Sequence, residues 1–351
     1  MVYADYAATY PYVKYPSSAY GPFFNPNTNY AYKEKHLLSE AENRVKKAIG
    51  VKGGKVIFGG TSSQLIENLF THIYDETNEY LIICSIYEHD SVWRFADQWG
   101  NIDSLKHVIQ TYHGDKQLIV CLMGVNNLTG EIMPVEEIGK LCHKHDAFYI
   151  CDMTAMIGHT PIPTNLDDWC SCAVWSGHKL GTELGIGAMW VSDRFDKWLD
   201  GFKLHGTPNL AGALAMTQAV EDACDVSSLE DKNAQWMDLS DELYSRLLDV
   251  CDDVKQIGNN EGCWAINTIR LPGINARTLQ SYLASKEIYI GLGQSSCADK
   301  ADRRILCQGY GLSEQEADEV IRISFGEDSN AEDVKILVEN ICEFKKIYLD
   351  N

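Results

Sequence analysis

Residues 147–181 read AFYICDMTAMIGHTPIPTNLDDWCSCAVWSGHKLG, and this stretch decides the fold. Two short apolar runs, 147–151 and 172–175, lie on either side of a more polar segment. Runs of this length with polar ends are typical of strands that are buried on both faces of a parallel sheet. The first run leads directly into Asp152 and the second into the tetrapeptide SGHK at 176–179. Because chemistry in such sheets gathers at the carboxyl ends of the strands, both places are candidates for a functional site.

The same alternation of apolar strands and helices extends outward through the chain. Strands are predicted at 55–58, 80–84, 118–124, 188–191, 264–270, 288–290 and 321–325. Helices are predicted at 33–49, 64–73, 91–98, 135–145, 207–247 (with a break near 226–228), 276–285, 314–320 and 331–349. This pattern predicts an α/β fold with a mostly parallel sheet, followed by a smaller α+β lobe.

The composition limits the classes of partner. The chain has 351 residues, and its 50 Asp and Glu against 30 Lys and Arg give a formal net charge of −20. This acid excess argues against binding to nucleic acid or to an anionic membrane, because both are held by basic side chains. An anionic ligand therefore has to be held by local amides, hydroxyls and cations.

The 12 cysteines are expected to be reduced and mostly buried. The start, MVYADYAATY, has neither a basic nor an apolar leader pattern, and no apolar run approaches the roughly 20 residues of a membrane span. These features predict a cytoplasmic protein. Cys170 and Cys172 lack a second ligand pair, and the spacing of His143 and His145 turns their rings to different helix faces. We therefore predict no metal site.

Single residues allow more than one interpretation. Lys179 at a strand end is either a surface lysine or a desolvated amine nucleophile. Asp152 either caps a helix or pairs with a cationic ring nitrogen. Ser62 and Ser63 lie between Gly59-Gly60 and a helix, where backbone amides can hold a phosphate. The order of these elements along the chain carries more weight than any one of them.

That order resembles the class V aminotransferase and cysteine desulfurase family of the fold-type I pyridoxal-phosphate enzymes, over nearly the whole chain. The matching segments are Asp5-Tyr6-Ala7-Ala8-Thr9, Phe24-Asn25-Pro26, Ser62-Ser63-Gln64, Glu88-His89, Val125-Asn126-Asn127 with Gly130 and Pro134, Asp152, Ser176-Gly177-His178-Lys179, Gly185-Ile186-Gly187-Ala188, Gly206-Thr207, Ser295-Ser296-Cys297 and Arg322-Ile323-Ser324-Phe325-Gly326. The resemblance implies a large domain at 15–210, with a mostly parallel seven-stranded sheet flanked by helices. It implies a smaller α+β domain made of 1–14 and 211–351.

The resemblance also implies a role for each matching residue. Lys179 would carry pyridoxal 5'-phosphate as a Schiff base and move protons, and Asp152 would keep the ring nitrogen protonated. His89 would stack on the ring. The remaining implied contacts are Ser62, Ser63, Ser176 and His178 on the phosphate, Thr207 on a phosphate across a homodimer interface, Asn127 on the ring oxygen or the substrate, and Arg322 on the substrate carboxylate.

The reaction that the resemblance implies is desulfuration of L-cysteine to L-alanine. Cys297, in a small polar stretch typical of a flexible loop, would take the sulfur as a persulfide and pass it to an acceptor protein or a small molecule. An incidental loop cysteine is the alternative.

Four places depart from the family: Ala155 replaces a glutamine, and Leu128 replaces a glutamate. The run Lys203-Leu204-His205 stands where the family commonly has an arginine two residues before the Gly-Thr, and Gln294 either replaces a glycine or follows from an insertion after Gly293. Two further alternatives therefore stay open. One is an aminotransferase, epimerase, lyase or selenocysteine lyase that does not use Cys297, and the other is a non-enzymatic scaffold.

Overall fold

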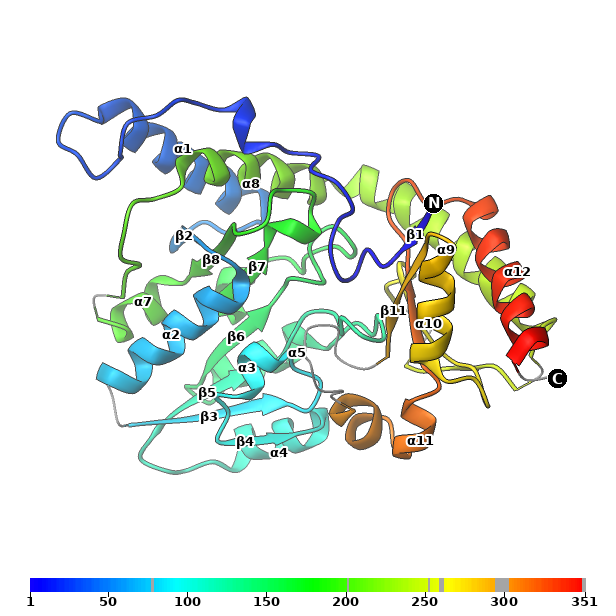
Figure 1. Cartoon of the computed structure of the whole chain (residues 1–351). Coiled ribbons are helices and arrows are strands. Elements are labelled where there is room, and N and C mark those ends of the chain that lie inside the picture. The colour runs from blue at the N-terminus through cyan, green and yellow to red at the C-terminus, as the bar shows by residue number, and fades with distance from the viewer. Residues whose placement is uncertain (77–78, 201, 252, 259–261, 294–302, 349–351) are drawn as a thin grey trace. The chain divides into compact units, whose positions relative to one another are not determined.

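The computed structural model describes residues 1–76, 79–200, 202–251, 253–258, 262–293 and 303–348. The chain divides into two compact units (Figure 1). The central unit contains Tyr12–Val125 and Met133–Leu229, and the terminal unit contains Met1–Pro11, Asn126–Ile132 and Glu230–Asn351.

The central unit is built on a seven-stranded sheet. In spatial order its strands are β2 (Lys55–Gly59), β8 (Gly187–Val191), β7 (Cys172–Ser176), β6 (Phe148–Asp152), β5 (Gln117–Cys121), β3 (Tyr80–Ser85) and β4 (Gln98–Gly100). Strands β7, β6, β5, β3 and β4 run parallel, and β8 runs antiparallel to both β7 and β2. The expected α/β fold with a mostly parallel sheet is thus confirmed.

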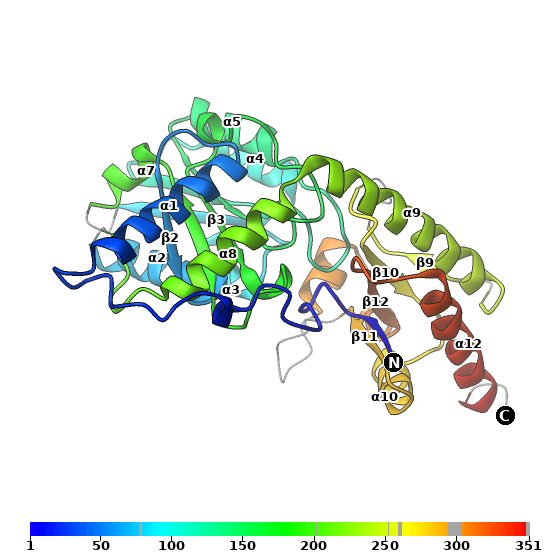
Figure 2. The ribbon, with the colours of Figure 1, turned by 90° about the horizontal axis from the view of Figure 1, so that it is seen from above.

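Helices cover both faces of this sheet, as two-sided burial of its strands requires. The helices of the unit are α1 (Tyr32–Ala48), α2 (Ser62–Glu76), α3 (Asp90–Trp93), α4 (Ile102–Thr111), α5 (Val135–Lys144), α6 (Leu166–Trp169), α7 (Asp193–Trp198) and α8 (Leu210–Ala223). Apolar residues of α2, such as Phe70, share one core cluster with Ile119 and Val174 of the strands. Helix α5 lies against β6, where Gly139 leaves room for Trp169 and Tyr149. Figure 2 shows α1 and α8 packed side by side.

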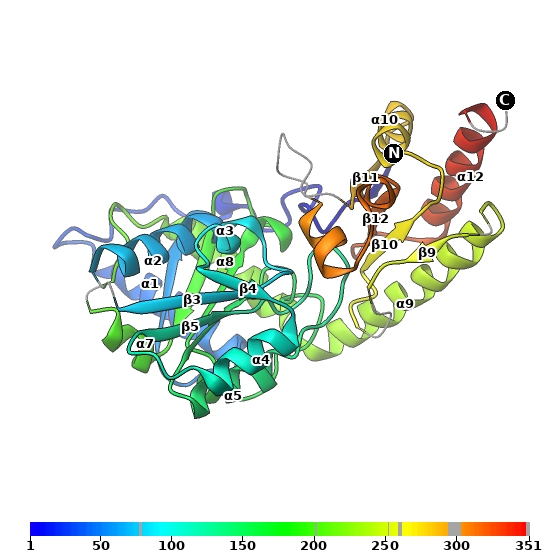
Figure 3. The same ribbon diagram turned by 90° about the horizontal axis from the view of Figure 1, so that it is seen from below.

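One predicted helix of the central unit is wrong in its second half. The helix predicted at 91–98 ends as α3 at Trp93, and Gln98–Gly100 instead forms the edge strand β4 beside β3 (Figure 3). Asp97 causes this change of direction, because its backbone N–H donates to the Ile82 carbonyl and its carboxylate accepts from the Ile82 N–H, both at 2.8 Å. Local helix propensity therefore gives way to strand pairing.

The terminal unit contains a five-stranded sheet. In spatial order its strands are β1 (Val2–Ala4), β11 (Ile288–Leu292), β12 (Val320–Ser324), β10 (Ile266–Arg270) and β9 (Lys255–Gln256). Strand β1 pairs with β11 in parallel, and the other pairs are antiparallel. The helical elements here are α9 (Val226–Leu248), which belongs to this unit from Glu230 onward, α10 (Ala276–Ser285), η3 (Ile305–Gly309), α11 (Glu314–Ala317) and α12 (Ala331–Tyr348).

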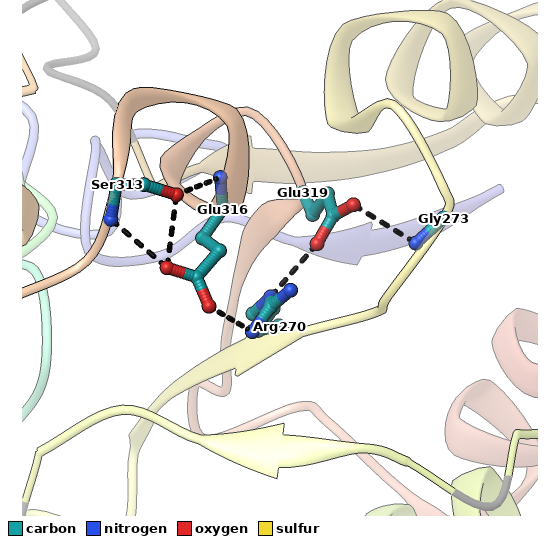
Figure 4. A network of polar contacts seen from close by, with 5 residues as sticks. All are labelled: Arg270, Gly273, Ser313, Glu316 and Glu319. Atoms are coloured by element: carbon teal, nitrogen blue, oxygen red, sulfur yellow. Dashed lines mark hydrogen bonds and ion pairs between the residues drawn. The ribbon is translucent and has the colours of Figure 1, made fainter.

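An ion network fixes α11 to strand β10 (Figure 4). The Arg270 guanidinium donates to Glu316 at 2.6 Å and to Glu319 at 2.7 Å. Glu316 also closes a capping box with Ser313, and Glu319 accepts from the Gly273 N–H. Charge and helix capping therefore stabilise the same short segment.

Within the described ranges, the helices are all too short or too polar to span a lipid bilayer.

Candidate active site

Most of the predicted site residues of the central unit lie along one edge of its sheet. Asp152 is the last residue of β6 and Ser176 the last of β7, and these two strands are neighbours. His89 follows β3, and Ser62 begins α2 three residues after the end of β2. Strands β2, β3, β6 and β7 run in the same direction, so their carboxyl ends bring these residues to a common edge.

Asp152 is held in one orientation. Its Oδ1 accepts a hydrogen bond from the Thr154 N–H at 2.9 Å, and its side chain is almost fully buried. The Gly124 N–H donates to the Asp152 carbonyl at 2.9 Å, so the backbone is fixed as well. A buried carboxylate fixed in this way is suited to pair with a cationic heterocycle nitrogen.

Lys179 ends a single 3₁₀ turn, Gly177–Lys179, that continues directly from β7. The turn is fixed at both ends, because Gly177 donates to the Ile186 carbonyl and accepts from the N–H groups of Leu180 and Thr182. Burial, with the charge of Lys179, lowers the pKa of His178 to about 4. His178 is therefore neutral at physiological pH and can serve as a hydrogen-bond donor rather than as a cation.

The start of α2 forms an anion-binding arrangement. Thr61 Oγ1 accepts from the Gln64 N–H, and Gln64 Oε1 accepts from the Thr61 N–H, which is a reciprocal capping box. The first-turn amides of Ser62 and Ser63 then point out of the helix, where the helix dipole favours negative charge. Gly187 allows this closeness, since a Cβ there would lie 2.9 Å from the Ser62 nitrogen.

Ser176 carries a buried hydroxyl that has no hydrogen-bond partner among the described residues. Buried hydroxyls are normally paired, so an unpaired one at a strand end marks a place where a ligand oxygen fits.

His89 is the N-cap of α3. Its Nδ1 accepts from the Ser91 N–H at 3.2 Å and lies 2.8 Å from Ser91 Oγ. With Nδ1 accepting from Ser91, Nε2 is the ring nitrogen left to donate, and the orientation of the ring is fixed by the helix that it caps.

Thr207 is exposed and lies beside a cleft of about 840 Å³ in the central unit. The Asn25 amide donates to Thr207 Oγ1 at 3.2 Å, and the Asn27 amide donates to the Gly206 carbonyl at 3.0 Å. Gly60 and Gln64 line the same cleft, whereas Lys179 and Asp152 do not. The cleft therefore belongs to the α2 end of the site.

Asn127 and Arg322 lie in the terminal unit. Arg322 NH1 donates to the Asn127 carbonyl at 2.9 Å, and NH2 pairs with Asp5 at 2.8 Å. Asn127 Oδ1 and Arg322 Nε are buried, and neither has a partner in the described part of the chain. Cys297 lies outside the described residues.

Three contributors were missed or undervalued in the sequence. The Thr61-x-x-Gln64 capping box could have been recognised in the sequence from its motif. Thr154, beside Asp152, has a buried hydroxyl that finds no partner in the described ranges. Glu88 is fully buried and its Oε1 accepts from Ser85 Oγ and from the Met123 N–H, which joins the ends of β3 and β5. No local pattern signals that last contact.

The residues of the central unit fit pyridoxal 5'-phosphate. The unpaired Ser176 hydroxyl, the α2 amides and neutral His178 are phosphate donors, and Asp152 is a partner for a protonated ring nitrogen. Lys179, three residues after Ser176 in the turn that follows β7, would supply the amine.

Comparison with known proteins agrees with this geometry. The model of the class-V aminotransferase family matches residues 11–337. The cysteine desulfurase IscS of Rickettsia felis is 24% identical, over 97% of this chain and 90% of its own, and that of Methanosarcina thermophila is 24% identical over 97% and 91%.

Solved structures share the fold. A NifS-like protein from Rickettsia africae ESF-5 superposes with a TM-score of 0.83 at 20% identity, covering 99% of both chains. The apo structure of a cysteine desulfurase from Thermococcus onnurineus NA1 gives a TM-score of 0.76 at 19% identity, over 98% of this chain and 94% of its own. The resemblance inferred from the motifs is confirmed: the chain belongs to the class-V aminotransferase family, whose coenzyme is pyridoxal 5'-phosphate.

Proposed function

We propose that this chain is a pyridoxal-phosphate-dependent cysteine desulfurase that converts L-cysteine to L-alanine. The observation that carries the proposal is the adjacency of β6 and β7, which end in Asp152 and in the turn of Lys179. The relatives named cysteine desulfurase, matched over 97% of this chain, support the same reaction.

The coenzyme, when bound, supplies the electron sink that lets a bond at the substrate Cα break heterolytically. Lys179 Nζ provides the covalent attachment and then carries the Cα proton. The carboxylate of Asp152 holds a proton on the ring nitrogen. Ser62, Ser63, Ser176 and His178 hold the phosphate by hydrogen bonds, and His89 presents its Nε2 proton to the reacting region.

Cys297 is proposed as the sulfur carrier. Its thiolate attacks the sulfur of the substrate, an S–S bond forms and the substrate C–S bond breaks. The electron pair stays with carbon, which is protonated to become the methyl group of alanine. L-cysteine and the Cys297 thiol thus give L-alanine and a Cys297 persulfide, with no external oxidant.

The proposal also includes the oligomeric state, the cellular compartment and the sulfur acceptor. Exposed large apolar side chains, Phe24, Tyr30, Tyr32 and Leu184, support a homodimer in which Thr207 reaches the partner's phosphate. The cysteines of the described ranges are unbonded, which supports a reducing, cytoplasmic setting. An acceptor protein or a small molecule would take the persulfide sulfur.

A substitution at Cys297 tests the reaction. The protein, loaded with coenzyme, is incubated with L-cysteine and a thiol reductant, and both alanine and sulfide are measured. Cys297→Ala should lose sulfide release, whereas Cys307→Ala should retain it. Cys307 is a matched control because it is half-buried and burial raises the pKa of its thiol, so it holds less thiolate. Wild-type sulfide release from Cys297→Ala would show that the proposed nucleophile is wrong.

A second candidate keeps the coenzyme and changes the reaction. Ala155 places no amide beside Thr154, and Leu128 is a buried core residue where the family has a glutamate. These replacements favour an aminotransferase, epimerase, lyase or selenocysteine lyase. Turnover of amino acids without sulfur, unaffected by Cys297→Ser, would support this candidate.

A further inference from the structure

We propose that Asp5 and Gly291 are positioning residues that fix the Arg322 guanidinium for the α-carboxylate of the amino-acid substrate. The inference rests on the proposed function in one respect, since it takes Arg322 as the carboxylate-binding residue. It adds that the N-terminal strand of this chain sets the affinity for the carboxylate.

Three neighbouring strands of the terminal unit bring the residues together. Strand β1 pairs with β11 so that Ala4 lies opposite Ile290, and Asp5 follows directly. Strand β11 pairs with β12 so that Gly291 lies opposite Arg322. Asp5 and Arg322 are 317 positions apart in sequence, and only the strand order of this sheet makes them neighbours.

Arg322 is a buried cation with a fixed neutralising partner. Its side chain is 3% exposed, and its NH2 lies 2.8 Å from Asp5 Oδ1. Because a charge without a partner is costly to bury, the Asp5 carboxylate is what allows Arg322 to lie inside the unit. The side chain of Asp5 is 19% exposed, so it is the less desolvated member of the pair.

Two of the five N–H groups of the guanidinium hold it in place, and three remain. NH2 donates to Asp5 and NH1 donates to the Asn127 carbonyl. Nε has no partner among the described residues, and NH1 and NH2 each keep one further proton. A planar fork held at two corners with unused donors is suited to a second carboxylate.

The Asn127 carbonyl is itself held rigidly. The Thr268 hydroxyl of β10 donates to the Leu128 carbonyl, and the Asn126 side chain accepts from the Leu128 N–H at 2.9 Å. The loop 126–132 is thus fixed to β10 at Thr268, the residue that lies opposite Arg322 of β12.

Gly291 leaves the space in which this arrangement lies. A Cβ at position 291 would lie 2.6 Å from Asp5 Oδ1, 2.9 Å from Arg322 Nε and 3.0 Å from NH2. These distances are shorter than ordinary contacts, so an alanine would separate the pair. The backbone of Gly291 does not adopt a positive φ, and its substitution therefore tests the space alone.

The test separates the carboxylate from the rest of the ligand. The coenzyme-loaded protein is titrated with L-alanine and with L-alaninamide, which has the same amine and no carboxylate, and binding is followed by the absorbance of the coenzyme. Asp5→Asn and Gly291→Ala should each weaken L-alanine binding by about tenfold, as expected for loss of an ordered charge-assisted contact. Binding of L-alaninamide should stay within about twofold, because the amide is not held by charge.

Glu327→Gln is the matched control. Glu327 accepts from the Tyr10 hydroxyl at 2.6 Å, so this substitution also perturbs how the N-terminal segment is held, away from Arg322. It should leave the ratio of the two affinities unchanged. In an Arg322→Ala background, Asp5→Asn should have no further effect on L-alanine, since Asp5 acts through Arg322.

The outcomes are distinguishable. If Arg322→Ala leaves the affinity ratio unchanged, the role of Arg322 in the proposed function fails and the inference fails with it. If Arg322→Ala lowers the ratio of the affinity for L-alanine to the affinity for L-alaninamide but Asp5→Asn does not, only the inference is overturned. Tighter L-alanine binding by Asp5→Asn would mean that Asp5 competes for Arg322, which also overturns it.

Discussion

At the scale of single residues, the site is marked by polar atoms that the protein leaves unpaired. Ser176 and Ser171 are both buried serines of the β6–β7 region, but only one is satisfied within the described structure. Ser171 Oγ accepts from the Tyr149 N–H at 3.1 Å, whereas Ser176 Oγ has no partner there. Because an unmade hydrogen bond in the interior costs about as much as a made one contributes, the two hydroxyls should respond oppositely to removal.

Ser176→Ala should leave the stability of the coenzyme-free protein unchanged or raise it, and should weaken coenzyme binding by about tenfold. Ser171→Ala should lower the free energy of unfolding by about 1 kcal/mol or more and leave coenzyme affinity unchanged. Urea unfolding and equilibrium dialysis measure the two quantities. Equal coenzyme affinity in Ser176→Ala and wild type would contradict the phosphate role of Ser176.

His178 should make the stability of the coenzyme-free protein depend on pH. Its pKa falls from 6.5 to about 4 on folding, so the unfolded chain binds more protons between these values. The stabilisation from the neutral ring is therefore complete above about pH 6.5 and is lost as the pH falls toward 4. The free energy of unfolding, measured with urea between pH 5 and 7, should rise more steeply with pH in wild type than in His178→Gln. If the free energy of unfolding changes equally with pH in both proteins, His178 does not titrate in this way.

At the scale of elements, strand positions were predictable and some boundaries were not. Buried strands such as β6 and β7 are recognised from continuous apolar runs, and the residues after them could be assigned to the site. Helix α4 was missed although Asn101 caps it and Leu105 and Ile109 form its buried stripe. The Asp5–Arg322 pair could not be predicted, because strand order in the terminal sheet depends on contacts between distant segments.

The ion network on β10 makes a prediction about one such element. Arg270 and Glu319 are each nearly nine-tenths buried, so Arg270→Ala leaves two carboxylates without their cation. We expect this change to lower the free energy of unfolding by about 2 kcal/mol or more. Lys335→Ala removes an exposed partner of Glu332 and should cost less than about 1 kcal/mol. Denaturant unfolding compares the two, and similar losses would show that burial of the network contributes little.

At the scale of the whole molecule, the fold separates inert thiols from the proposed reactive one. Burial raises the pKa of the thiols of Cys121, Cys142, Cys151, Cys170 and Cys172 in and around the central sheet. The thiolate is the form that reacts with electrophiles, and these side chains are also closed to reagents. The cysteines buried in and around the central sheet are therefore expected to be unreactive.

Alkylation of the native protein with iodoacetamide at neutral pH should consequently leave the sheet cysteines unmodified, while modification of Cys297 removes sulfide release. Adding urea above the unfolding midpoint should expose Cys84, Cys121 and Cys172 together, because these three thiols are buried in the same core cluster. Peptide mass spectrometry at increasing urea measures each site, with half-buried Cys342 of α12 as an internal reference that is labelled earlier. Labelling of Cys121 or Cys172 in the native protein, at a rate near that of Cys342, would contradict a closed core and weaken the assignment of the chemistry to a single thiol.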